Sequence, residues 1–120
     1  MNDIKLPEKA KEMILDEGNE IFYSTASVWE ITIKHMLHPD KIRISGGLLA
    51  EGCEKNGYMV LPVFNKHVTA LETLKRPENT PRHNDPFDRI MVAQAKAEEL
   101  MFLTHDSLIP YYEEPFIISV

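Results

Sequence analysis

The chain contains a single cysteine, and this scarcity excludes several classes of protein. With Cys53 as its only thiol among 120 residues, the chain forms no internal disulfide, and no Cys/His spacing resembles a zinc site. No apolar run approaches the roughly 20 residues of a membrane-spanning helix. The first residues have neither the apolar segment nor the cleavage site of a secretory signal. We therefore expect a cytoplasmic protein with no membrane partner.

Positive charge is also scarce. Lys and Arg number 13 against 19 Asp and Glu, so the formal net charge is −6 at pH 7. This balance argues against a general phosphate-binding surface, and any nucleic-acid function would need a local basic rim or a bound cation. Apolar residues, by contrast, make up 43% of the chain, enough for one core in one domain spanning residues 1–120.

Helices and short apolar strands alternate along the chain. Apolar periodicity, helix caps and proline positions predict helices over 6–17, 25–36, 47–54, 65–74, 86–99 and 107–111. Strands are predicted over 20–24, 58–62, 101–104 and 115–119. Asn65 is the candidate N-cap of the fourth helix. This alternation predicts an α/β fold with a mainly parallel sheet that is covered by helices on both faces.

Acidic side chains gather where these strands and helices meet. The stretch His83–Arg89 opens a small-residue helix and contains Asp85 and Asp88, while Asp106 directly follows a strand. Glu30 lies in the first turns of another helix that follows a strand. Because ligands of parallel α/β folds bind at the carboxyl edge of the sheet, these acids can converge there. Converging carboxylates suit Mg²⁺ or Mn²⁺, and such an ion serves phosphodiester hydrolysis.

Each acid also has an ordinary structural interpretation. Asp85 fits a helix N-cap, with Asp88 as the acid of the first turn. Glu30 completes a capping-box pattern and stands four residues before Lys34, as in a surface ion pair. Asp106 fits a cap on the following short helix. Singly these roles are the common ones, but their joint occurrence at strand ends favours a site.

Basic side chains near this cluster have two interpretations as well. Arg82, His83 and Arg89 are candidates for contacting phosphate, and each is also compatible with ordinary surface charge. The sequence leaves both alternatives open. Trp29 fits a core position better than a platform for stacking bases, and Cys53 has no evident basic partner that would make it a nucleophile.

Three segments together resemble a known family. Residues 24–31 (Ser-Thr-Ala-Ser-Val-Trp-Glu-Ile), 85–95 (beginning Asp-Pro-Phe-Asp-Arg) and 103–106 (Leu-Thr-His-Asp) are similar to successive signatures of PIN-domain proteins, in particular the VapC-like toxins. The resemblance implies a PIN-like α/β/α sandwich, RNA cleavage that depends on Mg²⁺ or Mn²⁺, and neutralisation by a cognate antitoxin protein.

The resemblance also implies roles for individual residues. Glu30, Asp88 and Asp106 match the family's acids by position and would act as catalytic metal ligands, whereas Asp85 belongs to the signature of the subgroup. Arg82 or Arg89 would steady the phosphate of the RNA substrate. These assignments are expectations that follow from the resemblance.

The chain departs from the family's pattern at its start. PIN domains usually begin with a central strand that ends in an acid, and residues 1–7 instead resemble the connection after that unit. We therefore expect an N-terminally truncated sheet that is marginally stable, swapped or oligomeric, a homodimer being one such form. The alternative function is a non-catalytic, antitoxin-binding or degenerate PIN-domain module.

Overall fold

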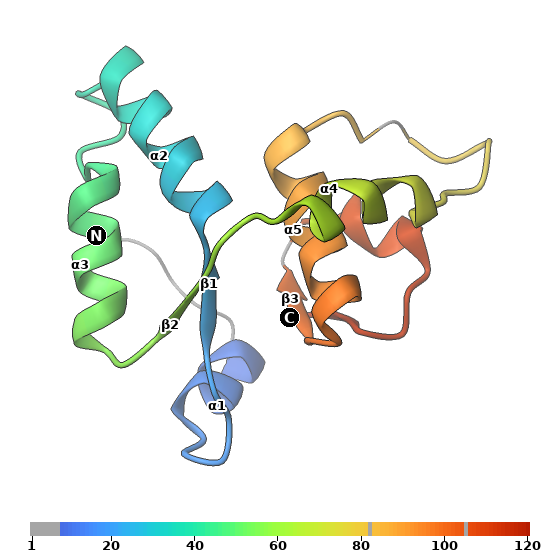
Figure 1. The fold of residues 1–120 in the computed structure, drawn as a ribbon, viewed down its shortest axis with the longest axis horizontal. Coiled ribbons are helices and arrows are strands. Elements are labelled where there is room, and N and C mark those ends of the chain that lie inside the picture. The colour runs from blue at the N-terminus through green and yellow to red at the C-terminus, as the bar shows by residue number, and fades with distance from the viewer. Residues whose placement is uncertain (1–7, 82, 105) are drawn as a thin grey trace.

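The fold is described by a computed structural model that covers residues 8–81, 83–104 and 106–120. Helices and strands alternate as predicted, and Figure 1 shows their arrangement. The first part holds α1 (Glu8–Leu15), β1 (Phe22–Ser24), α2 (Thr25–Leu37), α3 (Gly46–Lys55) and β2 (Met59–Leu61). The second holds α4 (Asn65–Ala70), η1 (Leu71–Thr73), α5 (Pro86–Glu98), β3 (Phe102–Thr104), η2 (Ile109–Tyr112) and β4 (Ile117–Ser119).

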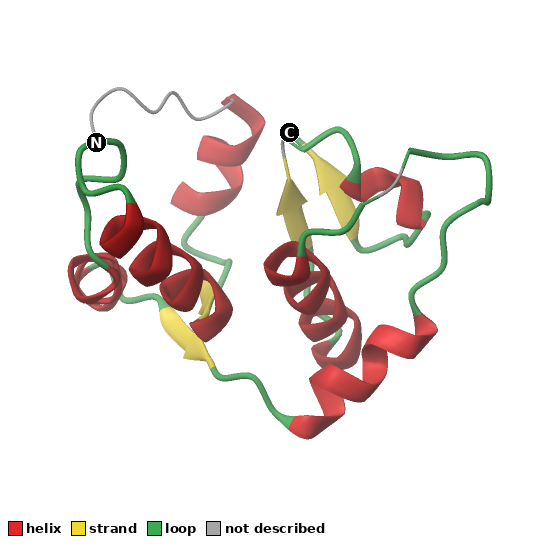
Figure 2. Ribbon diagram, turned by 90° about the horizontal axis from the view of Figure 1, so that it is seen from above, coloured by secondary structure: helices red, strands yellow, loops and turns green. Residues whose placement is uncertain are grey.

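The strands form two separate parallel pairs. β1 pairs with β2, with Tyr23 opposite Val60, and β3 pairs with β4, with Leu103 opposite Ile118. Figure 2 shows the β3–β4 pair apart from β2, on the other side of the molecule. The predicted parallel direction is therefore confirmed, but the prediction of one sheet is wrong for the described residues. The chain is a mixed α/β protein with short parallel strands, and none of its described helices has the length and apolar character to cross a membrane.

Side-chain caps explain where several helices begin. Asp85 caps α5, because its Oδ1 accepts hydrogen bonds from the backbone N–H groups of Phe87 (2.9 Å) and Asp88 (3.1 Å). The predicted cap of α4 is wrong. Phe64, not Asn65, is the N-cap residue, and its N–H donates to Nδ1 of His67 at 3.0 Å. The His67 ring, from within the first turn of α4, thus satisfies the N–H of the N-cap residue itself.

A buried glutamine and an aromatic pair connect the two parts of the fold. Gln94 of α5 is 1% exposed, and its Oε1 accepts a hydrogen bond from the hydroxyl of Ser24 at the end of β1. Its Nε2 donates to the carbonyls of Leu61 and Pro62, both at 3.2 Å. Trp29 of α2 contacts Phe87 of α5 edge to face, with ring centroids 4.9 Å apart. α5 is therefore the element that positions β1 and β2 relative to β3.

The main apolar core lies beside α5, on the side of β3 and β4. Its buried members are Val92, Ile109 and Tyr112, and partly buried side chains of Leu74, Phe102, Phe116 and Ile117 pack against them. This core fixes the start of α5 relative to the segment after β3. Those are the two places from which the predicted acids Asp88 and Asp106 project.

Candidate metal centre

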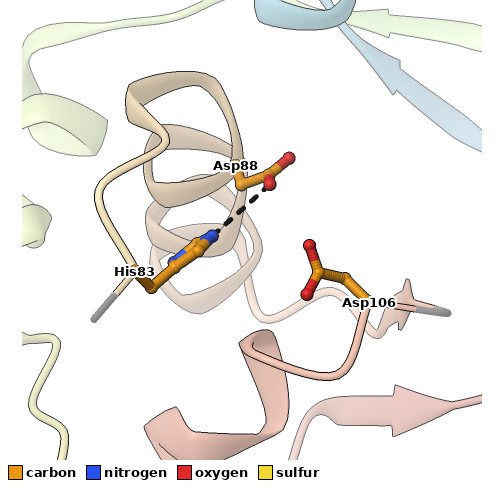
Figure 3. A group of neighbouring side chains, drawn as sticks. All are labelled: His83, Asp88 and Asp106. Carbon is orange, nitrogen blue, oxygen red and sulfur yellow. Dashed lines mark hydrogen bonds and ion pairs between the residues drawn. The ribbon is translucent and has the colours of Figure 1, made fainter. Parts of the chain in front are cut away.

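Three side chains from different segments meet next to the first turn of α5. They are His83 before the helix, Asp88 in its first turn, and Asp106 after β3. Each offers one ligand atom, and these atoms all lie within 4.8 Å of one another. Figure 3 shows the three side chains together, with the contact between His83 and Asp88 drawn as a dashed line. His83 is buried, Asp88 is partly buried and Asp106 is exposed, so the cluster opens to solvent on the side of Asp106.

The local structure explains how both acids are oriented. Asp88 is held near the helix start because Asp85 caps α5. Asp106 lies in a tight turn: its N–H donates to Oγ1 of Thr104 at 3.0 Å, and its own Oδ1 accepts from the N–H of Leu108 at 2.7 Å. The helix cap expected of Asp106 is wrong, because Leu108 is the N-cap residue of η2 and the Asp106 carboxylate instead closes a two-residue turn before that helix. This hydrogen bond and metal binding are compatible, because a carboxylate has two oxygens with several lone pairs.

His83 contacts a tyrosine on one ring nitrogen and an aspartate on the other. Its Nδ1 lies 2.7 Å from the hydroxyl of Tyr112, and its Nε2 lies 3.4 Å from Oδ2 of Asp88. The Tyr112 hydroxyl can donate to Nδ1 or accept from it, so it is compatible with either tautomer of the ring. When the hydroxyl accepts, Nε2 has the free lone pair that a metal ligand requires.

Burial and nearby negative charge at Asp88 favour a bound cation. Burial raises the pKa of Asp88, and the nearby carboxylates of Asp85 and Glu30 raise it further, while the hydrogen bond from His83 opposes this rise. A divalent ion would stabilise the charged form of Asp88 and offset its desolvation. The electrostatics of the described residues therefore fit a bound cation.

Two of the predicted metal ligands lie outside the three-residue cluster. Glu30 pairs with Nζ of Lys34 at 2.8 Å, the surface pair that the sequence also allowed, and this hydrogen bond raises the pKa of Lys34. Asp85 is the helix cap. Both nevertheless lie near enough to Asp88 to affect its pKa. They add negative charge around the cluster without joining it.

The predicted phosphate-binding residues are placed unequally. Arg82 lies outside the described residues. Arg89 of α5 interacts with the hydroxyl of Tyr112 and, together with Arg76, counteracts the rise that burial causes in the pKa of that phenol. The guanidinium of Arg89 is thus at the Tyr112–His83 side of the cluster.

His83 is a candidate metal ligand that the sequence pattern did not indicate. Its expected role is phosphate contact, although it stands five residues before Asp88 in the stretch that opens α5. The sequence feature that could have indicated this role is the imidazole of His83 placed shortly before Asp85 and Asp88 at the start of a helix. With His83 the donor set becomes one nitrogen and two carboxylates, which suits Mn²⁺ better than Mg²⁺ because Mg²⁺ favours oxygen ligands.

No protein-family model, no curated protein and no solved structure matches this chain.

Proposed function

We propose that this chain is a metal-dependent endoribonuclease of the toxin type, with a PIN-like α/β/α arrangement and a cognate antitoxin protein as partner. The observation that carries the proposal is the convergence of Asp88 and Asp106, which are 18 residues apart in sequence and project from different elements. The motifs around these two acids are the ones that resemble the VapC-like signatures. The proposed substrate is RNA, and the proposed reaction is hydrolysis of a phosphodiester bond.

The roles of individual residues follow from their positions. Asp88, Asp106 and Nε2 of His83 would hold Mn²⁺ or Mg²⁺, and the ion would supply a Lewis acid for a phosphoryl oxygen and for water. Glu30 adds negative charge nearby, which favours retention of the ion. Arg89, beside Tyr112, offers a guanidinium that can pair with a phosphate of the substrate.

Cleavage of a labelled RNA pool in Mn²⁺, in Mg²⁺ or in chelator tests the activity. We expect cleavage only when metal is present. Asp88→Asn and Asp106→Asn should each lower the cleavage rate on the order of 100-fold or more, because removing a group that merely supports a metal ligand already costs about 10–100-fold in activity. Asp85→Asn is the matched control, because Asn caps a helix about as well as Asp and the variant loses only the charge. Cleavage that resists chelator, or that neither ligand variant reduces, would exclude the proposed chemistry.

Metal binding can be measured without any assumption about the substrate. We expect Mn²⁺ to raise the melting temperature of the protein, Asp88→Asn to abolish the rise, and His83→Gln to reduce it. Asp40→Asn, at an exposed turn outside the cluster, is the control for a general effect of removing one acid. An equal response in wild type and in Asp88→Asn would show that Asp88 serves only in the helix start.

A second function is favoured by one further feature of the surface. An open apolar groove of about 360 Å³ lies between α2, α4 and the start of α5, and its walls include Trp29, Val68 and Phe87. The Trp29 side chain is 60% exposed there. A groove of this kind suits a protein partner, which supports the non-catalytic, antitoxin-binding module. A chain that binds its antitoxin but cleaves no RNA with either metal would establish that alternative.

A further inference from the structure

The free edges of two strands face each other across a cleft. Met59 N–H donates to the carbonyl of Ile21, so the backbone groups of Phe22, the next residue, point away from β2. In the other pair, the Phe102 N–H donates to the carbonyl of Phe116, and the carbonyl of Thr104 accepts from the N–H of Val120. The backbone groups of Leu103 therefore point away from β4. Among the described residues, β1 and β3 each have one strand neighbour. Their second edges can therefore pair with another strand.

The cleft between these edges is bounded by both strands along its length. Two adjoining cavities of about 360 and 450 Å³ share Phe22 and residues 100–103 as walls. Residues 19–22, before and at the start of β1, line the same end as Glu99 and Leu100, before β3. The amino ends of the two strands are thus on the same side. A strand between them can run parallel to both.

Helices cover both faces of this cleft. Met91, Gln94 and Ala95 of α5 line one cavity, and Met13 and Ile14 of α1 line the other. A segment in the cleft would therefore be enclosed above and below as well as along both edges. Strands with both faces covered are continuously apolar, not alternately apolar and polar.

The entrance at the amino ends of the strands is acidic. Glu20 and Glu99 both line it, and both are exposed. A basic residue just before an inserted strand would lie beside these two carboxylates. The charge of the entrance thus complements Lys or Arg at the amino end of the occupant.

We propose that this cleft binds a β-strand of another polypeptide segment, made of about five consecutive apolar residues preceded by Lys or Arg. The strand runs parallel to β1 and β3 and pairs with the backbone of both, so that the two pairs become one five-stranded sheet. Two-stranded sheets are marginally stable alone, and three or more strands with a covered face are not. The inference is independent of the proposed metal chemistry, because no residue of the metal cluster lines the cleft.

A fluorescein-labelled synthetic peptide, two lysines followed by Val-Ile-Leu-Val-Ile, tests the proposal. We expect saturable binding by fluorescence anisotropy. A control peptide with Pro in place of its central Leu should bind at least about tenfold more weakly, because Pro removes a ladder donor. A second control with two glutamates in place of the lysines should also bind more weakly. Equal binding of the Pro peptide would overturn the proposal.

Amide hydrogen exchange locates the bound peptide. We expect the peptide to slow exchange at Phe22 and Leu103, whose N–H groups face the cleft, and to leave Met59 and Phe102 unchanged because they already donate within their pairs. If Leu103 is protected without peptide and the protein is a dimer by light scattering, a second copy fills the cleft. Protection without peptide in a monomer would show that the cleft is closed. Either result would overturn the proposal.

Two variants separate pairing from general instability. Leu103→Pro removes one donor that faces the cleft and leaves the hydrogen bonds of Phe102 and Thr104 to the other strand's segment, so peptide affinity should fall about tenfold. The double variant Glu20→Lys/Glu99→Lys changes only exposed side chains, and it should reverse the preference from the lysine peptide to the glutamate peptide. Unchanged preference in a folded double variant would contradict the proposed orientation of the strand.

Discussion

The two parts of the molecule, residues 8–62 and 63–120, bury their apolar side chains very differently. In the second part, Val92, Ile109 and Tyr112 are 0–6% exposed and form a closed core. In the first part, the buried residues are small ones: Ala10, Ser24, Ala26 and Gly46. Seven of its large apolar side chains are at least half exposed: Leu15, Trp29, Met36, Leu37, Leu48, Met59 and Val60. The second part thus has its own core, whereas the first lacks a cover for its apolar surface.

This difference in packing also determines which part can hold a metal site. His83, Asp88 and Asp106 all belong to the well-packed second part, and Tyr112 of its core contacts His83 directly. Glu30, from the first part, influences the cluster only through its charge. A precise metal site needs ligands that are held by packing, and only the second part supplies that support. We expect the metal site to depend on the second part and to tolerate changes in the first.

The largest expected effect comes from opening the core of the second part. Ile109→Ala should lower the free energy of unfolding by about 2–5 kcal/mol, because it removes buried methyl groups and leaves a cavity. Val60→Ala in the first part, at a side chain that is 50% exposed, should change it by less than about 0.5 kcal/mol. Urea unfolding of both variants measures the contrast. Equal losses would mean that the two parts are packed alike in solution.

A smaller effect is expected where two helices of the first part touch. A Cβ atom on Gly46 would lie 1.8 Å from Oγ1 of Thr32 and 2.9 Å from the carbonyl of Val28. Gly46→Ala should therefore push α3 from α2 and cost about 1–3 kcal/mol of unfolding free energy.

Gly52→Ala is the matched control for that substitution. It lies in the same helix, with nothing within 4 Å of an added Cβ, and should stabilise the protein by up to about 1 kcal/mol. The Mn²⁺-induced rise in melting temperature should persist in Gly46→Ala, since the ligands lie in the second part. Loss of the metal response together with stability would contradict the independence of the two parts.

Sequence predicted the features that depend on local pattern. The four strands, the position of α2 and the Asp85 cap of α5 follow from apolar periodicity and capping residues within one segment. The meeting of Asp88 with Asp106 followed from one general rule, that parallel strands place their carboxyl ends at the same edge. No comparable local rule indicates which strands become neighbours, and so the division into two pairs was not predicted.

The features that sequence missed depend on contacts between distant residues. His83 joins the acids because Tyr112, 29 residues later, holds its Nδ1. Asn65 has the residue type of a cap, but Phe64 takes the N-cap position, and its N–H donates to the ring of His67. That ring is fully buried and contacts Glu98 of α5 through its other nitrogen. Propensity gives the common role of a residue type, and tertiary packing decides whether that role is taken.

The charge of the metal cluster should appear in the pH dependence of stability. Because the pKa of Asp88 is raised in the folded protein, its contribution to stability is fully present below its unfolded pKa and is lost as pH rises through its folded pKa. In chelator, Asp88→Asn should therefore be more stable than wild type at neutral pH, and the difference should shrink in acid. Denaturant unfolding from pH 3 to pH 8 measures it. A variant that is less stable at every pH would show that the Asp88 carboxylate is stabilising.

The smallest effect concerns the contact between α4 and α5, which ties the second part together. Glu98 Oε1 accepts from Nζ of Lys66 (2.7 Å) and Nε2 of His67 (2.8 Å), and these bonds lower the pKa of Glu98. This contribution is present above the unfolded pKa of Glu98 and is lost as pH falls through its folded pKa. Glu98→Gln keeps an acceptor for His67 but loses the charge that pairs with Lys66. It should thus be slightly less stable than wild type at neutral pH and equal to it in acid.

Glu51→Gln is the control, because it removes an exposed partner of Lys55 in the first part, and its change in unfolding free energy should stay below about 0.5 kcal/mol at any pH. If both variants show the same flat pH profile, the Glu98 contact adds no more than an ordinary surface pair, and the second part is held together by its apolar core alone.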